Sequence, residues 1–433
     1  MVLYSSIYIL VNNIYEILLK AQLLKKLFKL SFINIKTTLL IKILMDLSDI
    51  TTPDITELKP ILDEYGVAIL ENYFDDEYAD EVFSSVKKWL IDLDIGLSDD
   101  ISTWTNKNVP FGPRYGMYQS IVSNAPKFWE LREKFYPIFQ EILSEDELLT
   151  SIDGSSFFPT INSPKNKADW AHIDQTVSSK FMCYQSQFVA TNTNASFVCT
   201  PGSHKLHHSI LKKFSIESNT NWHKFTDSEV QQLKKIFKKY YQIPILAKKG
   251  SIIFWDSRTI HSAKYPDIKE NSWRAVFYIS MRPKKMFSPK DIYNIQTAVI
   301  EGKTTNHWGS TIFKPFDRFK MKNTEISNLV TNSKKISYYP QMTQLQRKIC
   351  DFTPSEHDDI KAQCLFLLNK CLQENAINAN LYRKISCYVK SNDDINTTRK
   401  ITRLLMKQYC TKVDSSDKIL SFIDPKNIKY VEV

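Results

Sequence analysis

The chain has 433 residues, more than a single domain usually has, which predicts one main domain with a smaller additional unit. Hydrophobic residues make up 43% and aromatic residues 12%, which excludes a disordered chain, because such chains lack the apolar surface that offsets the entropy of ordering. The net charge of +10 lies in the flanks: residues 1–44 carry +5, residues 331–433 carry +6, and the residues between them carry −1. Net charge therefore gives no support for a nucleic-acid groove in the middle of the chain.

The first 44 residues are apolar and basic. Asn12 and Glu16 interrupt any run long enough to cross a bilayer. The first lysine, Lys20, follows the apolar stretch, whereas a signal peptide carries its positive charge before it. Two interpretations stay open: a basic amphipathic helix that touches membranes, or an upstream extension of a chain that starts at Met45, which we favour.

The seven cysteines are odd in number and form no CxxC pair. This pattern argues against a disulfide framework and against a structural zinc site. We therefore expect a reducing compartment, the cytoplasm.

The elements expected from position 46 onward begin with helices around one short strand. A helix is expected over 56–65, a strand follows Gly66, and a second helix runs from Asp75, its N-cap, to about Leu93. The expected order of elements at the start of this domain is therefore helix, strand, helix.

Between residues 151 and 286 the pattern changes to short β-rich runs separated by turns such as PGSH and KKGS. Many short strands without crossover helices predict an antiparallel double-stranded β-helix, a cupin-like jelly roll, in a mainly β fold with flanking helices. One helix is expected between the strands, over 228–241, with its lysines on a solvated face. After about residue 333 the sequence is helical nearly to its end. The predicted units are 1–44, a main domain over 45–333 and an all-helical extension over 334–433.

Three residues of the β-rich region form a candidate metal site. About one His-x-Asp/Glu triplet is expected by chance in this composition, so the pair His172 and Asp174 needs support from its context. The two residues are two apart at the front of the β-rich region, where i and i+2 of a strand point to the same face. His261 returns from a distant strand. Two imidazoles and one carboxylate make the ligand set of the iron(II) oxygenases, which leaves coordination positions open.

Arg274 is the candidate anchor for a cosubstrate. It lies on the next expected strand, thirteen residues after His261. Its guanidinium can hold a carboxylate through two hydrogen bonds. A dicarboxylate such as 2-oxoglutarate could chelate iron at one end and meet Arg274 at the other.

The ordered motifs EYGVAILENYF, AHIDQ, TPGSH, GSIIFWDSRTIHSA and WRAVFYISM resemble the phytanoyl-CoA dioxygenase family. The segment KTTNHW at 303–308 resembles a stretch of some fungal and viral members. The resemblance implies that His172, Asp174 and His261 bind Fe(II), and that Arg274 and Gln175 lie at the 2-oxoglutarate site. It further implies decarboxylation of 2-oxoglutarate to succinate, with O2 as oxidant and hydroxylation of a C–H bond of a small organic substrate.

Two other functions stay open on the sequence alone. The first is a jelly-roll binding or structural protein that keeps the metal residues without turnover. The second is an oxygenase that acts on nucleic acid or protein through its basic flanks, although the sequence gives no strong support for nucleic acid or a membrane as partner. A cluster of His204, His207 and His208 follows the PGSH turn, and we expect it to shape a loop at the mouth of the site rather than to bind a second metal.

Overall fold

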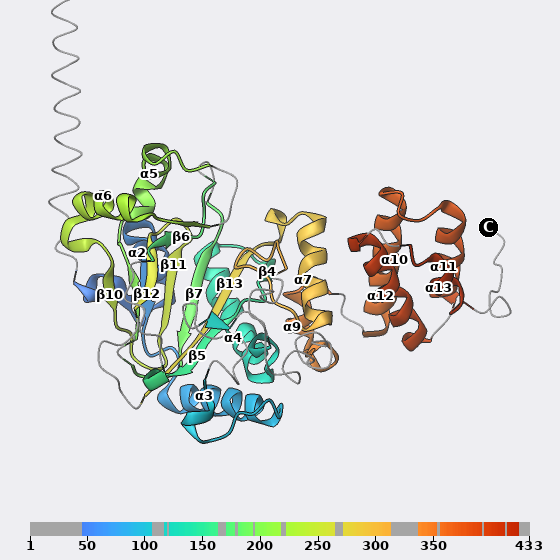
Figure 1. Cartoon of the computed structure of the whole chain (residues 1–433), viewed down its shortest axis with the longest axis horizontal. Helices are drawn as coiled ribbons and strands as arrows, with labels where there is room; N and C mark the ends of the chain where they lie inside the picture. Colours follow the sequence, from blue (N-terminus) through green and yellow to red (C-terminus); the bar gives the residue numbers. More distant parts are fainter. Residues whose placement is uncertain are drawn as a thin grey trace, which may run out of the picture. The chain divides into compact units, whose positions relative to one another are not determined.

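The computed structural model describes residues 46–105, 117–118, 121–162, 170–177, 181–193, 195–217, 222–264, 272–312, 337–352, 356–391, 394–411 and 414–423 (Figure 1). The chain divides into two compact units, Met1–Thr51 and Thr52–Val433. In the first unit the described residues form the 3-10 helix η1 (Leu47–Ile50), which Asp46 caps. The basic segment 1–44 and both interpretations of it lie outside the described residues.

The second unit begins with the expected alternation of helix and strand. Asp75 caps the second long helix through a hydrogen bond from Tyr78 N, as its position in the sequence predicts. Gly66 ends the first helix in a left-handed conformation (φ +70°), and a Cβ there would lie 2.3 Å from His204 Nδ1. Only glycine therefore fits at this turn. The elements are β1 (Thr51–Thr52), η2 (Ile55–Glu57), α2 (Leu58–Tyr65), β2 (Val67–Leu70) and α3 (Asp76–Asp92).

The β-rich region contains the strands that the sequence predicts, together with several shorter ones. Their bounds are β3 (Met117–Tyr118), β4 (Leu148–Thr150), β5 (Ser155–Pro159), β6 (His172–Ile173), β7 (Tyr184–Val189), β8 (Ser196–Cys199), β9 (His223–Lys224), β10 (Ile243–Ile245), β11 (Ile252–Asp256), β12 (His261–Lys264) and β13 (Trp273–Pro283). The helices among them are α4 (Pro126–Leu143), α5 (His207–Lys213), α6 (Asp227–Phe237) and α7 (Pro289–Glu301). Short 3-10 helices connect them: η3 (Ile101–Thr103), η4 (Val122–Asn124), η5 (Thr160–Asn162), η6 (Ser203–Leu206), η7 (Lys238–Tyr240) and η8 (Lys284–Met286).

Eight of these strands form two antiparallel sheets in the order of a double-stranded β-helix. The large sheet contains β5-β13-β7-β11, extended by β2 and β3 at its edges, with β4 also paired to β13. The small sheet contains β6-β12-β8-β10, extended by β9. The chain passes from one sheet to the other between β5 and β6, β6 and β7, β7 and β8, β10 and β11, β11 and β12, and β12 and β13. This crossing pattern is that of a jelly roll, and it confirms the predicted fold.

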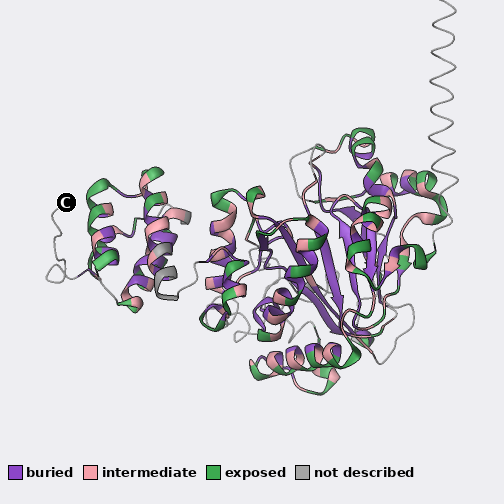
Figure 2. Cartoon of the chain, turned by 180° about the vertical axis from the view of Figure 1, so that it is seen from behind, coloured by how far each residue is buried: buried purple, intermediate pink, exposed green. Residues whose placement is uncertain are grey.

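The large sheet is buried by helix α4, which contacts β13. Aromatic side chains dominate this packing: the rings of Phe128 and Phe277 lie 5.0 Å apart, and those of Phe139 and Phe254 lie 5.6 Å apart. Figure 2 shows the strands of the jelly roll as mostly buried. Because α4 covers one face of the large sheet, its other face is left for the interior of the jelly roll.

The chain beyond residue 337 begins with the helices η10 (Tyr339–Gln341) and α9 (Gln344–Lys348). Their apolar residues belong to the same core cluster as the large sheet. Thr150 N of β4 donates to Ile349 O at 2.8 Å, and Gln346 Nε2 donates to Glu133 of α4 at 2.9 Å. Residues 337–352, which the sequence pattern assigned to the helical extension, therefore pack into the core of the jelly roll, although Tyr339 OH also accepts a hydrogen bond from Gln363 of the extension at 3.4 Å. The expected boundary at 333–334 itself lies outside the described residues.

The expected helical extension is present, and its helices share an apolar core of their own. Cys364, Leu368 and Cys371 of its first helix are buried with Ile385 and Leu405 of the next two. The helices are α10 (Glu356–Gln373), α11 (Ala379–Ser391), α12 (Ile395–Thr411) and α13 (Ser416–Leu420).

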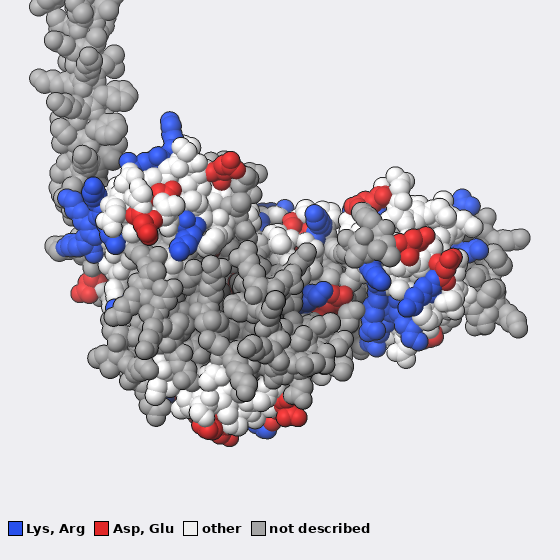
Figure 3. Space-filling model, viewed as in Figure 1, with Lys and Arg blue, Asp and Glu red and all other residues white. Residues whose placement is uncertain are grey.

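Helix α6 packs its buried residues against Ala171 and Ile173 beside the small sheet and has the solvated lysine face that its sequence predicts. Thr226 and Glu229 form a capping box at its start, and Val230 and Leu233 are its buried residues. Its two lysines, Lys234 and Lys235, are exposed. Lys and Arg side chains gather at the upper left of Figure 3, where Figure 1 labels this helix. Among the described residues, every helix is too short or too polar to cross a membrane.

Candidate metal centre

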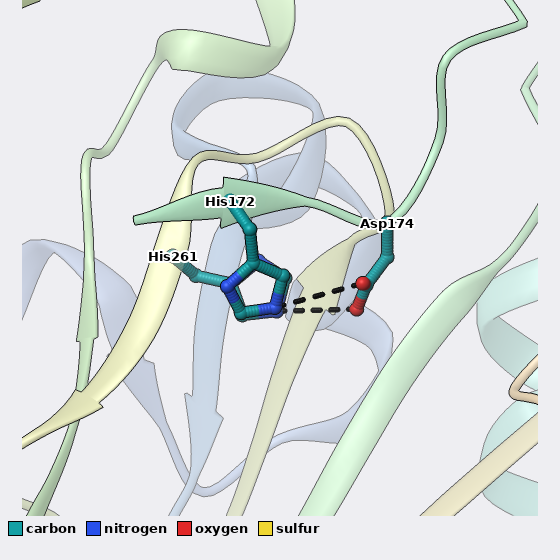
Figure 4. A group of neighbouring side chains, drawn as sticks. All are labelled: His172, Asp174 and His261. Carbon is teal, nitrogen blue, oxygen red and sulfur yellow. Dashed lines mark ion pairs between the residues drawn. The ribbon is translucent and has the colours of Figure 1, made fainter. Parts of the chain in front are cut away.

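His172, Asp174 and His261 come together inside the jelly roll (Figure 4). His172 of β6 lies directly opposite His261 of β12 in the antiparallel register, and their ring centroids are 4.2 Å apart. Asp174 follows β6, with its carboxylate 3.6 Å from His172 Nε2 and 3.2 Å from His261 Nε2. One ligand atom from each residue lies within 4.8 Å of the other two. In the described part of the chain, no other group of His, Cys, Asp and Glu has this geometry.

The orientation of both imidazoles is set by backbone hydrogen bonds. His172 Nδ1 lies 3.2 Å from Trp170 O, and His261 Nδ1 lies 2.9 Å from Thr259 O. A carbonyl oxygen can only accept, so each Nδ1 carries the proton and each Nε2 keeps its lone pair. Both lone pairs face Asp174, which is the arrangement of histidines that bind a metal through Nε2.

Asp174 is held by groups from outside the small sheet. Gln185 Nε2 of β7 donates to its carboxylate at 3.0 Å. His307 Nε2 donates to the backbone carbonyl of Asp174 at 3.0 Å, and the backbone N–H of Asp174 donates to Ser257 O at 3.1 Å. The large sheet thus fixes the carboxylate of Asp174, and the segment after α7 fixes its backbone.

Burial and charge place the site in the protonation state that a metal requires. Burial, together with the neighbouring His261, lowers the pKa of His172 to about 3. Burial raises the pKa of Asp174, but His307, His172 and His261 together outweigh it, so the pKa lies well below its usual range. A neutral imidazole and an ionised carboxylate are the forms that bind metal ions.

The three residues line a cavity of about 80 Å³. Aromatic rings form part of its wall and contact the imidazoles: Trp170 stacks on His172 at 4.7 Å, and Trp255 lies 5.5 Å from His261. The other residues of the wall are Asp153, Gln185, Gln187, Phe197, Ser262, Ala263, Arg274, Tyr278 and His307.

Arg274 of β13 lines the same cavity and is 2% exposed. Its Nη1 donates to Ala195 O at 2.8 Å, whereas its Nη2 has no hydrogen-bond partner among the described residues. Trp255 Nε1 is likewise buried without a described partner. Buried donors, above all a guanidinium, are costly to leave unpaired, so these groups fit an anionic ligand in the cavity. A carboxylate of 2-oxoglutarate has this chemistry.

Gln175 is fully buried, but its side chain is occupied by the protein itself. Its Nε2 donates to Val177 O at 2.6 Å, and its Oε1 accepts from Ser257 Oγ at 2.7 Å. It is not among the residues that line the cavity. The amides that do line it are Gln185 and Gln187 on β7, and the expected contact of Gln175 with the cosubstrate stays a prediction.

The histidines after the PGSH turn have structural partners. His204 Nε2 lies 3.2 Å from Asp63 O, and His207 Nε2 lies 2.7 Å from Gln175 O. His208 is exposed on α5. None of the three belongs to the group that could hold a metal ion, and their expected role in shaping the mouth of the site stays a prediction.

Two residues of the cavity, Asp153 and His307, are absent from the candidates that the sequence supplies. His307 lies in the segment 303–308, whose likeness to other sequences carried no chemical role. Asp153 precedes β5 in the sequence SIDGSS, where an acidic residue before glycine is typical of a turn. A signal for either residue would require knowing which loops surround the metal.

Comparison with known proteins supports the resemblance that the motifs indicate. Residues 189–265 match the family described as phytanoyl-CoA dioxygenase (PhyH), a segment that runs from the end of β7 through β12 and contains His261. The resemblance to this family is thereby confirmed, while the expected likeness to fungal and viral members stays a prediction. No curated protein sequence matched the chain.

Several solved structures are similar to part of the chain at low identity. EctD from S. alaskensis with bound Fe is 15% identical over 51% of this chain and 74% of its own, with a TM-score of 0.36. AviO1 from Streptomyces viridochromogenes is 15% identical over 55% and 98%, with a TM-score of 0.35. HygX from Streptomyces hygroscopicus, with nickel and 2-oxoglutarate bound, is 11% identical over 53% and 86%, with a TM-score of 0.36. Likenesses of this size do not assign a function to the chain.

Proposed function

We propose that the chain is an iron(II)- and 2-oxoglutarate-dependent dioxygenase that hydroxylates a C–H bond of a small organic substrate. The observation that supports this most is the combination, in one cavity, of two Nε2 lone pairs facing a carboxylate with a buried arginine that lacks a partner. A metal alone would not require the arginine, and an anion alone would not require the paired imidazoles.

His172, Asp174 and His261 would hold the iron(II), and Arg274 would bind the far carboxylate of 2-oxoglutarate. When bound, iron(II) and 2-oxoglutarate would supply, together with O2, the oxidising power for the reaction. The reaction converts 2-oxoglutarate to succinate and CO2 and a substrate C–H to C–O–H. An intact carboxylate at Asp174 occupies the position that a halide would otherwise take, which favours hydroxylation over halogenation.

The chain's own residues prepare the site before any ligand binds. The carbonyls of Trp170 and Thr259 fix the two rings, and Gln185 orients the carboxylate of Asp174. Phe197 packs 4.7 Å from Trp255 and 5.6 Å from His261, which keeps water away from one side of the small-sheet ligands. Such preorganisation limits the reorganisation that binding and reaction require.

Two measurements on the wild type and on His172→Ala test the proposal. The first is anaerobic binding of iron(II) with 2-oxoglutarate, followed by the visible absorption of their complex, and the second is release of succinate under air. We expect both in the wild type and neither in His172→Ala. The exposed His208→Ala is the matched control and should behave as the wild type. A wild type that binds no iron and releases no succinate would refute the proposal.

A further inference from the structure

The cavity holds one acidic side chain that neither metal binding nor the cosubstrate uses. Asp153 is 7% exposed and lines the cavity beside the metal-binding group. Its Oδ1 accepts a hydrogen bond from Gly154 N at 2.7 Å, and the structure gives its Oδ2 no partner among the described residues. Because Oδ2 is not among the fully enclosed polar atoms, it is open to the cavity, where a ligand could pair with it.

The nearest buried cation does not neutralise this carboxyl. Arg132 Nη2 donates to the backbone oxygen of Asp153 at 3.3 Å, and its Nη1 donates to Ser123 O at 2.9 Å. Burial raises the pKa of the Asp153 carboxyl to about 7, the Gly154 N–H lowers it, and the charge of Asp174 affects it more than that of Arg132. The carboxyl therefore lies in the field of the metal-binding carboxylate, on the cavity side of its loop.

A second segment fixes the wall in which Asp153 stands. Ile152 N donates to Thr305 Oγ1 at 2.9 Å, and Thr305 N donates to Ile152 O at 2.9 Å. Two residues farther on, His307 Nε2 donates to Asp174 O. The segment 303–308 thus connects the loop of Asp153 to Asp174, directly after β6, and its hydrogen bonds hold this wall in place.

His307 adds a second acceptor to the same wall. Because its Nε2 carries the proton that is donated to Asp174 O, its Nδ1 has a lone pair. No described residue donates to that nitrogen. The wall therefore presents a carboxyl and an imidazole lone pair, whereas the donors Arg274 and Trp255 form the part of the wall suited to an anion.

The charges of the filled site decide what this wall accepts. Resting on the proposed function, iron(II) and Arg274 would bring three positive charges into the cavity, and Asp174 and 2-oxoglutarate three negative ones. Ionised Asp153 then adds a negative charge that Arg132, which does not line the cavity, offsets only in part. A low-dielectric cavity disfavours an ionised group without a close counterion and favours a ligand that supplies one. We propose that Asp153 and His307 form a substrate subsite for a protonated amine, so that the substrate is a small organic ammonium compound and not an anionic ester.

The test uses the protein loaded anaerobically with iron(II) and 2-oxoglutarate, with n-butylammonium chloride and 1-butanol as probes of similar size. Binding of each is measured at pH 7 by titration calorimetry and by the change in the visible band of the loaded site. We expect the wild type to bind n-butylammonium at least about tenfold more tightly than 1-butanol, because only the cation pairs with Asp153. In Asp153→Asn, which keeps the oxygen that accepts from Gly154 N, this preference should disappear while the band itself still forms.

The exposed Asp99→Asn is the matched control and should keep the wild-type preference, since Asp99 pairs with Lys87 on the surface. Equal binding of the two probes to the wild type would overturn the inference without need of any variant. A preference that persists in Asp153→Asn would overturn the assignment to Asp153. If the visible band of the loaded site does not form in the wild type, the proposed function fails and this inference fails with it.

Discussion

The two sheets of the jelly roll contribute different chemistry to the same cavity. The small sheet supplies the imidazoles of His172 and His261, with Asp174 directly after its strand β6. Each of these three groups has a hydrogen bond that fixes it and faces the other two. The large sheet supplies Gln187 and Arg274, each of which has a buried polar atom with no described partner.

The fold itself supplies the hydrogen bonds of the small-sheet groups, whereas a ligand must supply those of the large-sheet groups. On the small sheet, backbone carbonyls already satisfy the Nδ1 donors, so an arrangement that could hold a metal ion exists in the protein alone. On the large sheet, the unsatisfied donors and acceptors are costly until a ligand pairs with them. The small sheet should therefore govern metal binding, and the large sheet should govern which organic molecules bind.

Replacing Arg274 gives the largest separation of these two roles. In Arg274→Met we expect the KM for 2-oxoglutarate to rise by roughly 100-fold, because a buried carboxylate loses its cation. Metal affinity, measured without 2-oxoglutarate, should stay within about threefold of the wild type, since Arg274 does not touch the metal group. Arg274→Lys should recover part of the loss, because lysine keeps the charge but not the two-pronged geometry.

A parallel loss of metal affinity in Arg274→Met would contradict the division between the sheets. The melting temperature of the variant is needed beside it, because Arg274 Nη1 also donates to Ala195 O. Arg274→Lys serves here as the control for folding.

Gln185 tests where the division is incomplete, because this large-sheet residue donates to a small-sheet ligand. In Gln185→Ala we expect iron(II) affinity to fall about tenfold, since residues that orient metal ligands typically contribute to this extent. Gln187→Ala is the matched control on the same strand: it lines the cavity but has no hydrogen bond to Asp174. Anaerobic metal titration of both variants checks the prediction, and equal affinities would show that Gln185 does not orient the carboxylate.

The sequence predicted the small-sheet part of the site better than the large-sheet part, for a physical reason. His172, Asp174 and His261 follow a pattern of residue types and alternation that a strand imposes locally. The roles of Gln185 and His307 depend instead on register and on loops that return from far along the chain, such as the pairing of Ile152 with Thr305. For Gln175 the resemblance predicts a contact with the cosubstrate that stays a prediction, and in the fold its amide oxygen accepts a hydrogen bond from Ser257.

The fold was predictable where helix caps and the alternation of apolar and polar residues determine the local structure. The cap at Asp75 and the strands around Ser186 and Phe254 need only local rules. The placement of Tyr339–Phe352 in the jelly-roll core was not predictable, because a short amphipathic helix does not specify which of two cores will bury it.

The smallest expected effect is a difference in how the two sides of the cavity respond to pH in the metal-free protein. Burial lowers the pKa of His172 to about 3, so its contribution to stability is present above its ordinary value of 6.5 and is lost as the pH falls. Burial raises the pKa of Asp153 to about 7, so its contribution is present below its ordinary value of 3.8 and is lost as the pH rises toward 7. The two residues therefore oppose each other between pH 3.8 and 6.5, where both windows overlap.

Asp153→Asn separates the two contributions, because asparagine does not ionise. Relative to the wild type, we expect the variant to gain on the order of 2 kcal/mol in free energy of unfolding between pH 5 and pH 8. The variant alone should then become more stable as the pH rises from 5, whereas the wild type changes less. Urea unfolding at both pH values measures this difference, with Asp99→Asn as the control. A constant difference between variant and wild type would mean that Asp153 is solvated in the folded protein, and its carboxyl would then need no partner from a substrate.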